Sequence, residues 1–300
     1  MVLAGATAVP RRAYGALAET LARAGLSVLT FDYRGVAGSA PRRLRGDRST
    51  MADWGQLDLD GALGWMRDRA PDLPLLLLGH SVGGQLLGFA EQAETLRGAL
   101  LVGSQSGYWR NWPGAARLRM WVHWHLVLPA VSTALGYASM SALGMGEDLP
   151  AGVARQWARW GRRPDFLLSD CTPAERERYR RLGFPIRAYH LADDTFAPRA
   201  AVEALLDFYR GARTELVSRA PAELDVPAIG HFGWLKPTFR ETLWREMAAW
   251  LLSRADEVSG RVELPPLEDK GVRSGPGRGE VAAGRHSAPW APGAAARGAR

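Results

Sequence analysis

The chain has 300 residues, 47% of them hydrophobic and 23% charged, which is long and apolar enough for a large folded core and excludes an intrinsically disordered protein. The net charge of +7 comes almost wholly from arginine, because Lys236 and Lys270 are the only lysines. No block of five or six like charges marks a polyanion-binding arm, so we expect no nucleic-acid partner.

The sequence carries no targeting or membrane signal. Its single cysteine, Cys171, excludes an intramolecular disulfide and a multi-cysteine metal site. The first residues lack the basic and apolar segments of a signal peptide, and no apolar run reaches the ~18 residues of a membrane span. We therefore expect a cytoplasmic protein without a membrane span, while its oligomeric state is left open.

Strand-like and helix-like segments alternate, which is typical of a parallel sheet with helices on both faces. The first half predicts strands at residues 2–6, 26–31, 74–78 and 99–103, and helices at 14–24, 53–69 and 82–94. In the second of these helices the pattern predicts a buried face made of Trp54, Leu57, Leu63, Trp65 and Met66.

The rhythm changes at residues 105–182, which hold six of the twelve tryptophans and no clear strand. This segment predicts a helical cap inserted into a core of residues 1–104 and 183–254. The core resumes with strands at 186–191 and 215–218 and helices at 200–209 and 238–252. Residues 255–300 are rich in Pro, Gly, Ala and Arg without periodicity and predict a disordered tail.

The strongest motif is Gly79-His80-Ser81-Val82-Gly83, which lies between a buried strand and a helix. This is the context of a nucleophile elbow, in which a strained turn exposes the serine hydroxyl at the end of the strand. Side chains at Gly79 and Gly83 would collide with the neighbouring strand or helix. An ordinary turn with a capping serine is the alternative, and the flanking pattern disfavours it.

A nucleophilic serine needs a base and an orienting acid, which follow it in the order Ser, Asp, His on this kind of fold. Asp193 and Asp194 follow the strand at 186–191, and His231 stands between Gly230 and Gly233 ahead of the last helix. Taken alone, each has an ordinary explanation as a loop residue. Their order behind Ser81 favours a catalytic triad.

These motifs resemble the α/β-hydrolases of the serine aminopeptidase and monoglyceride-lipase-like group over residues 1–254. The segment Asp32-Tyr33-Arg34-Gly35-Val-Ala-Gly-Ser39 is similar to the family's Asp-x-Arg-Gly-x-Gly-x-Ser loop, with Ala37 in place of its second glycine. The resemblance implies an α/β-hydrolase fold with an inserted cap. It also implies Asp194 as the triad acid, with Asp193 as its rival.

The resemblance further implies an oxyanion hole made by the backbone N–H groups of Val82 and Thr7. The family's His-Gly pair in the latter loop is replaced here by Gly5-Ala6. Family members carry two more strands before this point. The resemblance therefore implies either a trimmed sheet or a chain start downstream of the true one.

The cap offers aromatic residues for an acyl pocket over Ser81, namely Trp109, Trp112, Trp121 and Trp124, although they could equally form the core of the cap. His123 and His125 are two residues apart and point to different helix faces, so we expect no metal site there. Neither a metal nor an organic cofactor is implied.

The sequence thus predicts a serine hydrolase acting on a small lipophilic or monoacylglycerol-like ester. An aminopeptidase or amidase on the same triad is the nearest alternative and would need acidic cap residues, of which Glu147-Asp148 is the only adjacent pair. A non-catalytic hydrolase-like binding protein would carry a broken triad. A NAD-binding protein is disfavoured because no G-x-G-x-x-G follows the first strand.

Overall fold

Six parallel strands form the central sheet of the computed structural model, which describes residues 1–144 and 146–259. Their order is β2-β1-β3-β4-β7-β8, which confirms the predicted mostly parallel sheet. The strands are β1 (Val2–Ala4), β2 (Leu29–Thr30), β3 (Leu76–His80), β4 (Gly98–Val102), β7 (Ile186–Leu191) and β8 (Thr214–Arg219).

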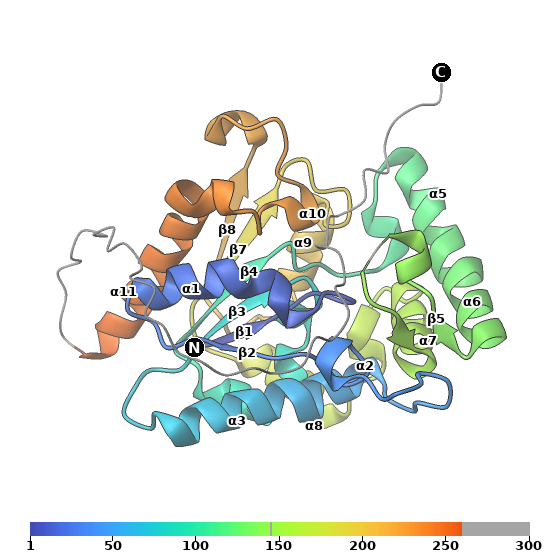
Figure 1. The fold of residues 1–300 in the computed structure, drawn as a ribbon, viewed down its shortest axis with the longest axis horizontal. Helices are drawn as coiled ribbons and strands as arrows, with labels where there is room; N and C mark the ends of the chain where they lie inside the picture. The colour runs from blue at the N-terminus through green and yellow to red at the C-terminus, as the bar shows by residue number, and fades with distance from the viewer. Residues whose placement is uncertain (145, 260–300) are drawn as a thin grey trace, which may run out of the picture.

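Helices cover both faces of this sheet (Figure 1). Within β3, Leu76 and Leu78 pack toward one face and Leu77 toward the other. Burial on both sides explains why the central strands are continuous apolar runs. One face is covered by α1 (Gly15–Arg23) and α11 (Arg245–Ser259), and the other by α3 (Asp60–Arg69), α8 (Pro173–Arg181) and α9 (Arg199–Leu206).

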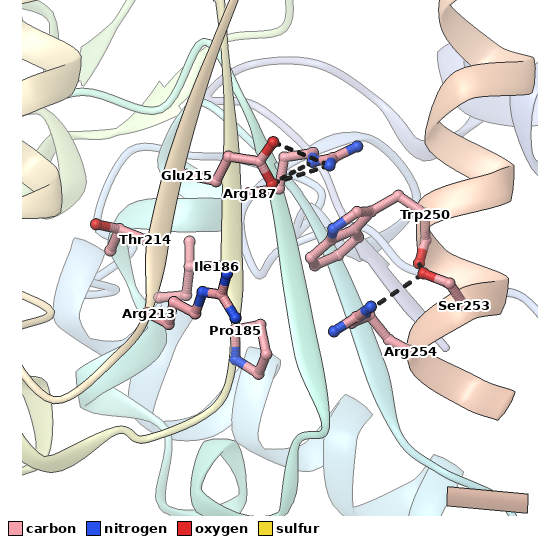
Figure 2. Close-up of a pocket in the computed structure, with 9 residues that line it drawn as sticks. All are labelled: Pro185, Ile186, Arg187, Arg213, Thr214, Glu215, Trp250, Ser253 and Arg254. Carbon is pink, nitrogen blue, oxygen red and sulfur yellow. Dashed lines mark hydrogen bonds and ion pairs between the residues drawn. The ribbon is translucent and has the colours of Figure 1, made fainter. Parts of the chain in front are cut away.

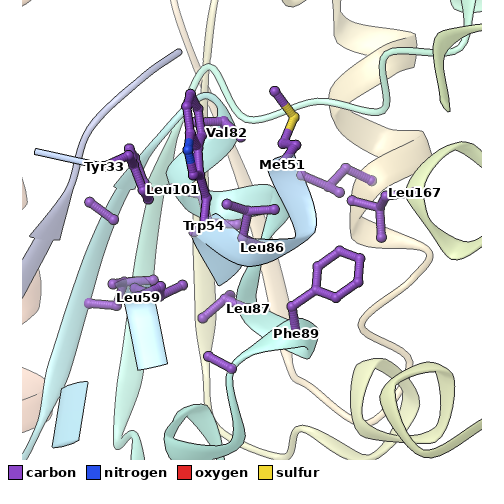
Figure 3. Packing of buried hydrophobic residues seen from close by; sticks show 14 of the residues in the cluster. Tyr33, Met51, Trp54, Leu59, Val82, Leu86, Leu87, Phe89, Leu101 and Leu167 are labelled. Atoms are coloured by element: carbon purple, nitrogen blue, oxygen red, sulfur yellow. The ribbon is translucent and has the colours of Figure 1, made fainter. Parts of the chain in front are cut away.

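The core on the α3 side surrounds Trp54, whose side chain is fully buried and stacks on Tyr33 at a ring distance of 4.7 Å. Figure 3 shows this cluster, in which residues of the elbow segment, such as Val82 and Leu86, pack beside the residues around Trp54. The elbow therefore packs against this cluster.

The segment between β4 and β7 is mainly helical. It contains α5 (Gly114–Val122), α6 (Leu128–Leu135) and α7 (Ala151–Gly161), which lie together at one side of the molecule (Figure 1). A short antiparallel pair, β5 (Tyr137–Ala138) and β6 (Leu149–Pro150), forms where no strand was predicted. The last helix of this segment, α8, instead covers the sheet. Its buried Tyr179 belongs to the core on that face, and the Tyr179 hydroxyl donates to the Gln85 carbonyl at 2.6 Å.

Two predicted helices differ from the structure. In the helix at 53–69, Leu57 and Trp65 were predicted to be buried, but each is 52% exposed. A π-helical turn over Trp54–Leu59 places an extra residue in the turn and shifts the buried stripe. The helix predicted at 82–94 ends as α4 (Val82–Gln85) and continues as 3₁₀ turns.

The carboxyl-terminal helix extends further than predicted, because α11 continues to Ser259 rather than ending at Leu252. The rest of the predicted tail, residues 260–300, lies outside the described residues. Across the part of the chain that the structure describes, no helix is long and apolar enough to cross a membrane.

Candidate active site

Ser81 lies in the tight turn between β3 and α4, with φ 53° and ψ −114°. Residues other than glycine seldom adopt this combination of backbone angles. Its N–H donates to the carbonyl of Val102 in β4 at 2.9 Å. A Cβ at Gly83 would stand 2.1 Å from the Ala4 carbonyl oxygen, so only glycine lets α4 pack this closely on β1. The turn thus has the geometry of a nucleophile elbow.

A buried acid–base pair lies at the same edge of the sheet. Nδ1 of His231 is 2.6 Å from Oδ2 of Asp194, and both side chains are almost completely buried. The other oxygen of Asp194 accepts the N–H groups of Phe196 at 2.8 Å and Ala197 at 3.0 Å. These donors fix the carboxylate in the orientation that receives the imidazole.

The adjacent carboxylate has a different position. Asp193 accepts the N–H groups of Ile229 at 2.8 Å and Gly230 at 3.0 Å, directly before His231. It therefore caps the loop that carries the histidine and does not contact the histidine ring. Of the two candidate acids, the structure brings Asp194 to His231.

The elbow and the acid–base pair meet at the end of β4. A Cβ at Gly103, the residue after Val102, would lie 3.1 Å from both Oδ2 of Asp194 and Nδ1 of His231. No hydrogen bond joins Ser81 to His231 within the described residues, and such contacts often form only when substrate is bound. A second imidazole lies close by, since the His80 ring is 5.0 Å from the His231 ring.

Two backbone N–H groups beside Ser81 are available to a ligand. Neither Thr7 N–H nor Val82 N–H has a hydrogen-bond partner in residues 1–144 and 146–259. The Thr7 hydroxyl is also buried without a partner there. Because Ala4 of β1 pairs with Gly79 of β3, the loop that carries Thr7 runs alongside the elbow.

The four candidate pocket tryptophans are divided between three environments. Trp112 is buried and its indole N–H donates to the carbonyl of Thr195, next to Asp194, at 3.0 Å. Trp124 packs against Trp157 inside the cap at a ring distance of 4.9 Å. Trp109 and Trp121 line a separate surface cavity of about 420 Å³. A hydrogen bond thus joins Trp112 to the loop of the candidate acid.

The motif Asp32–Ser39 braces the fold around the site. The Arg34 guanidinium and N–H bind both oxygens of Asp58 at 2.7 to 3.0 Å. Gly35 has φ 79°, and a Cβ there would stand 2.2 Å from Cγ of Pro150 in the inserted segment. This loop thus ties the region before α3 to the insert.

A cavity of about 550 Å³, whose lining Figure 2 shows, lies at the end of the sheet where β7 and β8 begin, whereas Ser81 follows the carboxyl end of β3. It is lined at the amino ends of β7 and β8, where Arg187 pairs with Glu215, and by Trp250 of α11. Its position separates it from the candidate site. Across the described residues, no group of three or more His, Cys, Asp or Glu side chains is placed to hold a metal ion.

Sequence reasoning missed two residues of this site, Tyr14 and His80. His80 occupies the variable position of the elbow motif, yet it is fully buried and binds the backbone carbonyl of His231 at 3.0 Å. Its other nitrogen lies 2.8 Å from the Tyr14 hydroxyl. A histidine beside the nucleophile and a tyrosine ten residues after the first strand were the only signals available.

A family model described as serine aminopeptidase matches residues 10–155, a segment that contains Ser81 but ends before Asp194 and His231. A search of curated proteins gives no match. Similar solved structures include a monoacylglycerol lipase of Paleococcus ferrophilus, with 16% identity and a TM-score of 0.54 over 84% of this chain and 93% of that one.

Two further solved structures share the fold. One, from work on the metagenome-derived lipolytic enzymes LipS and LipT, has 19% identity and a TM-score of 0.53 over 84% of this chain and 92% of that one. Est1E of Butyrivibrio proteoclasticus, with bound ferulic acid, has 15% identity and a TM-score of 0.51 over 84% and 88%. The chain therefore has the α/β-hydrolase fold. The match of the serine aminopeptidase model to residues 10–155 agrees with the resemblance seen in the sequence.

Proposed function

We propose that this protein is a serine hydrolase that cleaves a carboxylic ester through an acyl-enzyme. Ser81 is the nucleophile, His231 the general base and then general acid, and Asp194 the residue that orients His231. The observation that carries this proposal is the buried 2.6 Å contact between His231 and Asp194 at the sheet edge where the strained elbow presents Ser81.

The reaction follows from this arrangement. With Nδ1–H donated to Asp194, Nε2 of His231 is free to accept the proton of Ser81 as its oxygen attacks the ester carbonyl. His231 then gives that proton to the leaving alcohol as the tetrahedral intermediate collapses to the acyl-enzyme. Water, activated by the same Nε2, releases the acid and restores Ser81.

The developing oxyanion is received by the N–H groups of Val82 and Thr7. The Val82 N–H belongs to the first turn of α4, and both groups lack a partner among the described residues. Preorganised donors of this kind usually supply the largest part of transition-state stabilisation in acyl transfer.

The surroundings support an apolar substrate. Phe196 is 43% exposed although its ring lies 5.3 Å from that of His231, and Trp112 is buried beside the same loop. An exposed aromatic ring beside the base provides apolar contact for an acyl or alkyl group. We therefore favour a lipophilic or monoacylglycerol-like ester.

The aminopeptidase alternative lacks an available acidic pair in the cap. Glu147 forms an ion pair with Arg12 at 2.7 Å, and Asp148 accepts both the N–H and the hydroxyl of Ser141. Neither carboxylate is left unpaired to bind a substrate ammonium. A non-catalytic binding protein is disfavoured because such a protein has no need for a buried Asp194–His231 pair.

A panel of p-nitrophenyl esters and aminoacyl amides tests this proposal on the wild type, Ser81→Ala and a matched control, Ser132→Ala. Ser132 is a buried serine of α6 whose hydroxyl, within residues 1–144 and 146–259, binds only the Pro129 carbonyl one turn earlier. We expect ester turnover in the wild type and Ser132→Ala and a loss of about 10⁴-fold or more in Ser81→Ala. Retained turnover without Ser81, or cleavage of amides alone, would contradict it.

A further inference from the structure

A buried polar chain runs beneath the elbow and touches all three parts of the candidate site. The Ala6 N–H, in the loop that carries Thr7, donates to the Tyr14 hydroxyl at 2.7 Å. That hydroxyl lies 2.8 Å from Nδ1 of His80, the residue before Ser81. Nε2 of His80 lies 3.0 Å from the backbone carbonyl of His231.

The groups at the two ends of this hydrogen-bonded series determine the direction of each hydrogen bond in it. The Ala6 N–H can only donate and the His231 carbonyl can only accept. Tyr14 therefore uses its own proton toward Nδ1 of His80, and Nε2 of His80 carries the proton that binds the carbonyl. The indole N–H of Trp234 is 3.5 Å from the same Nε2, at the outer limit for a hydrogen bond, and does not compete with this arrangement.

A neutral His80 satisfies every group in this pattern. An imidazolium would make the Tyr14 oxygen accept twice and would leave the Tyr14 proton without its acceptor, Nδ1. Complete burial and the nearby His231 hold the pKa of His80 well below its ordinary value, which agrees with the neutral form. His80 is therefore a fixed donor and acceptor rather than a proton carrier.

The hydrogen bonds that link Ala6, Tyr14, His80 and His231 also account for a departure from the family pattern. The oxyanion loop carries Gly5-Ala6 in place of the family's His-Gly pair. A Cβ at Gly5 would lie 2.9 Å from Cε2 of Tyr14, so glycine at this position makes room for the tyrosine ring. Tyr14 then holds the N–H of Ala6, one residue before the proposed oxyanion donor Thr7.

We propose that Tyr14 and His80 are positioning residues that hold the oxyanion loop and the His231 loop in register with Ser81. This inference rests on the proposed serine-hydrolase function and deepens it. Neither residue contacts substrate. Tyr14 fixes the direction of the Thr7 N–H through Ala6, and His80 fixes the backbone of His231, while Asp194 fixes its ring.

The test compares Tyr14→Phe with Tyr33→Phe on a p-nitrophenyl ester. Both tyrosines are buried, but the Tyr33 hydroxyl has no hydrogen-bond partner among the described residues, so its removal deletes only an oxygen. We expect Tyr14→Phe to lower kcat about 10- to 100-fold with KM changed less than about 3-fold. The reason is that the Thr7 N–H is then no longer held in the orientation that binds the oxyanion. Tyr33→Phe should retain wild-type kinetics.

A second readout separates positioning from simple destabilisation. A trifluoromethyl ketone forms a tetrahedral adduct whose oxyanion occupies the hole, so its affinity should fall in Tyr14→Phe by the same factor as kcat. His80→Gln keeps one acceptor and one donor, whereas His80→Leu keeps neither. We therefore expect His80→Gln to retain at least about tenfold more activity than His80→Leu.

The outcomes distinguish this inference from the proposed function. If the wild type is active and depends on Ser81 while Tyr14→Phe and Tyr33→Phe have equal kcat and equal inhibitor affinity, the positioning role is wrong and the hydrolase function stands. If Ser81→Ala keeps full activity, the proposed function itself fails. Should His80→Leu not fold, the two tyrosine variants decide the question.

Discussion

At the scale of single residues, two adjacent carboxylates have unlike roles. Asp194 contacts the His231 imidazole, while Asp193 accepts the N–H groups of Ile229 and Gly230 and so holds the backbone on which His231 stands. The sequence identified this pair, and the family resemblance favoured Asp194 over Asp193, whereas the residues themselves left the order open. The order depends on how the loop after β7 turns, and no local pattern encodes that turn.

Replacement of each carboxylate by its amide should separate these roles. Asp194→Asn removes the charge that stabilises the His231 imidazolium and allows the wrong tautomer, so we expect kcat to fall about 10³- to 10⁴-fold. Asp193→Asn still offers one oxygen to the two N–H groups and should lose about tenfold or less. Steady-state kinetics on one ester measures both, and an equal loss in the two variants would refute the assignment.

Cys171 is expected to be unreactive. Burial, with Glu175 nearby, raises the pKa of its thiol to about 12, and the sulfur lies 3.5 Å from the Leu167 carbonyl. Because the thiolate is the reactive form, the native protein should react with a disulfide reagent at pH 8 at least about 100-fold more slowly than the urea-unfolded chain. Equal rates in the two states would show an accessible thiolate.

At the scale of elements, the elbow depends on glycines that cannot be replaced. A Cβ at Gly83 would enter the space of the Ala4 carbonyl, whereas one at Gly61, in the exposed part of α3, meets nothing within 4 Å. The two positions form a matched pair of helical glycines with opposite expectations.

Gly83→Ala should therefore destabilise the fold by at least about 2 kcal/mol, since β1 and α4 must move apart. Gly61→Ala should stabilise it by about 0.5–1 kcal/mol, because alanine loses less backbone entropy in a helix. Urea unfolding followed by circular dichroism measures both. A Gly83→Ala variant as stable as the wild type would mean that the elbow is packed less tightly than described.

The sequence predicted the bounds of an element well where neighbouring residues determine them. It predicted them poorly where contacts with residues distant in sequence determine them. The strand at 186–191 has the predicted bounds because Pro185 precedes it and the loop residues Asp193 and Asp194 follow it closely. The helix after the elbow is interrupted because the Tyr179 and Tyr209 hydroxyls bind the carbonyls of Gln85 and Gly84, which a longer helix would use itself. Those tyrosines are about a hundred residues away in sequence.

At the scale of the whole molecule, several histidines are held neutral by the fold. Burial lowers the pKa of His80, His123 and His190 below the ordinary 6.5, most strongly for His80. In the unfolded chain these residues take up protons below pH 6.5, whereas the folded chain resists them. The stability they contribute is therefore present above pH 6.5 and is lost as the pH falls.

We expect the free energy of unfolding to fall between pH 7 and pH 5, with His80 contributing up to about 1.4 kcal/mol per pH unit below its unfolded pKa. His80→Gln should reduce that slope by about this amount, whatever its effect on stability at pH 7. Urea unfolding across this pH range provides the comparison. Identical slopes in the two proteins would show that His80 titrates normally in the fold.

The proposed acyl-enzyme route requires Ser81 as the nucleophile. Reaction with a fluorophosphonate, followed by mass spectrometry of the protein and its peptides, tests this most directly. We predict one adduct per chain, located on Ser81, absent from Ser81→Ala and retained in Ser132→Ala. An adduct on another residue, or labelling that persists in Ser81→Ala, would contradict the account.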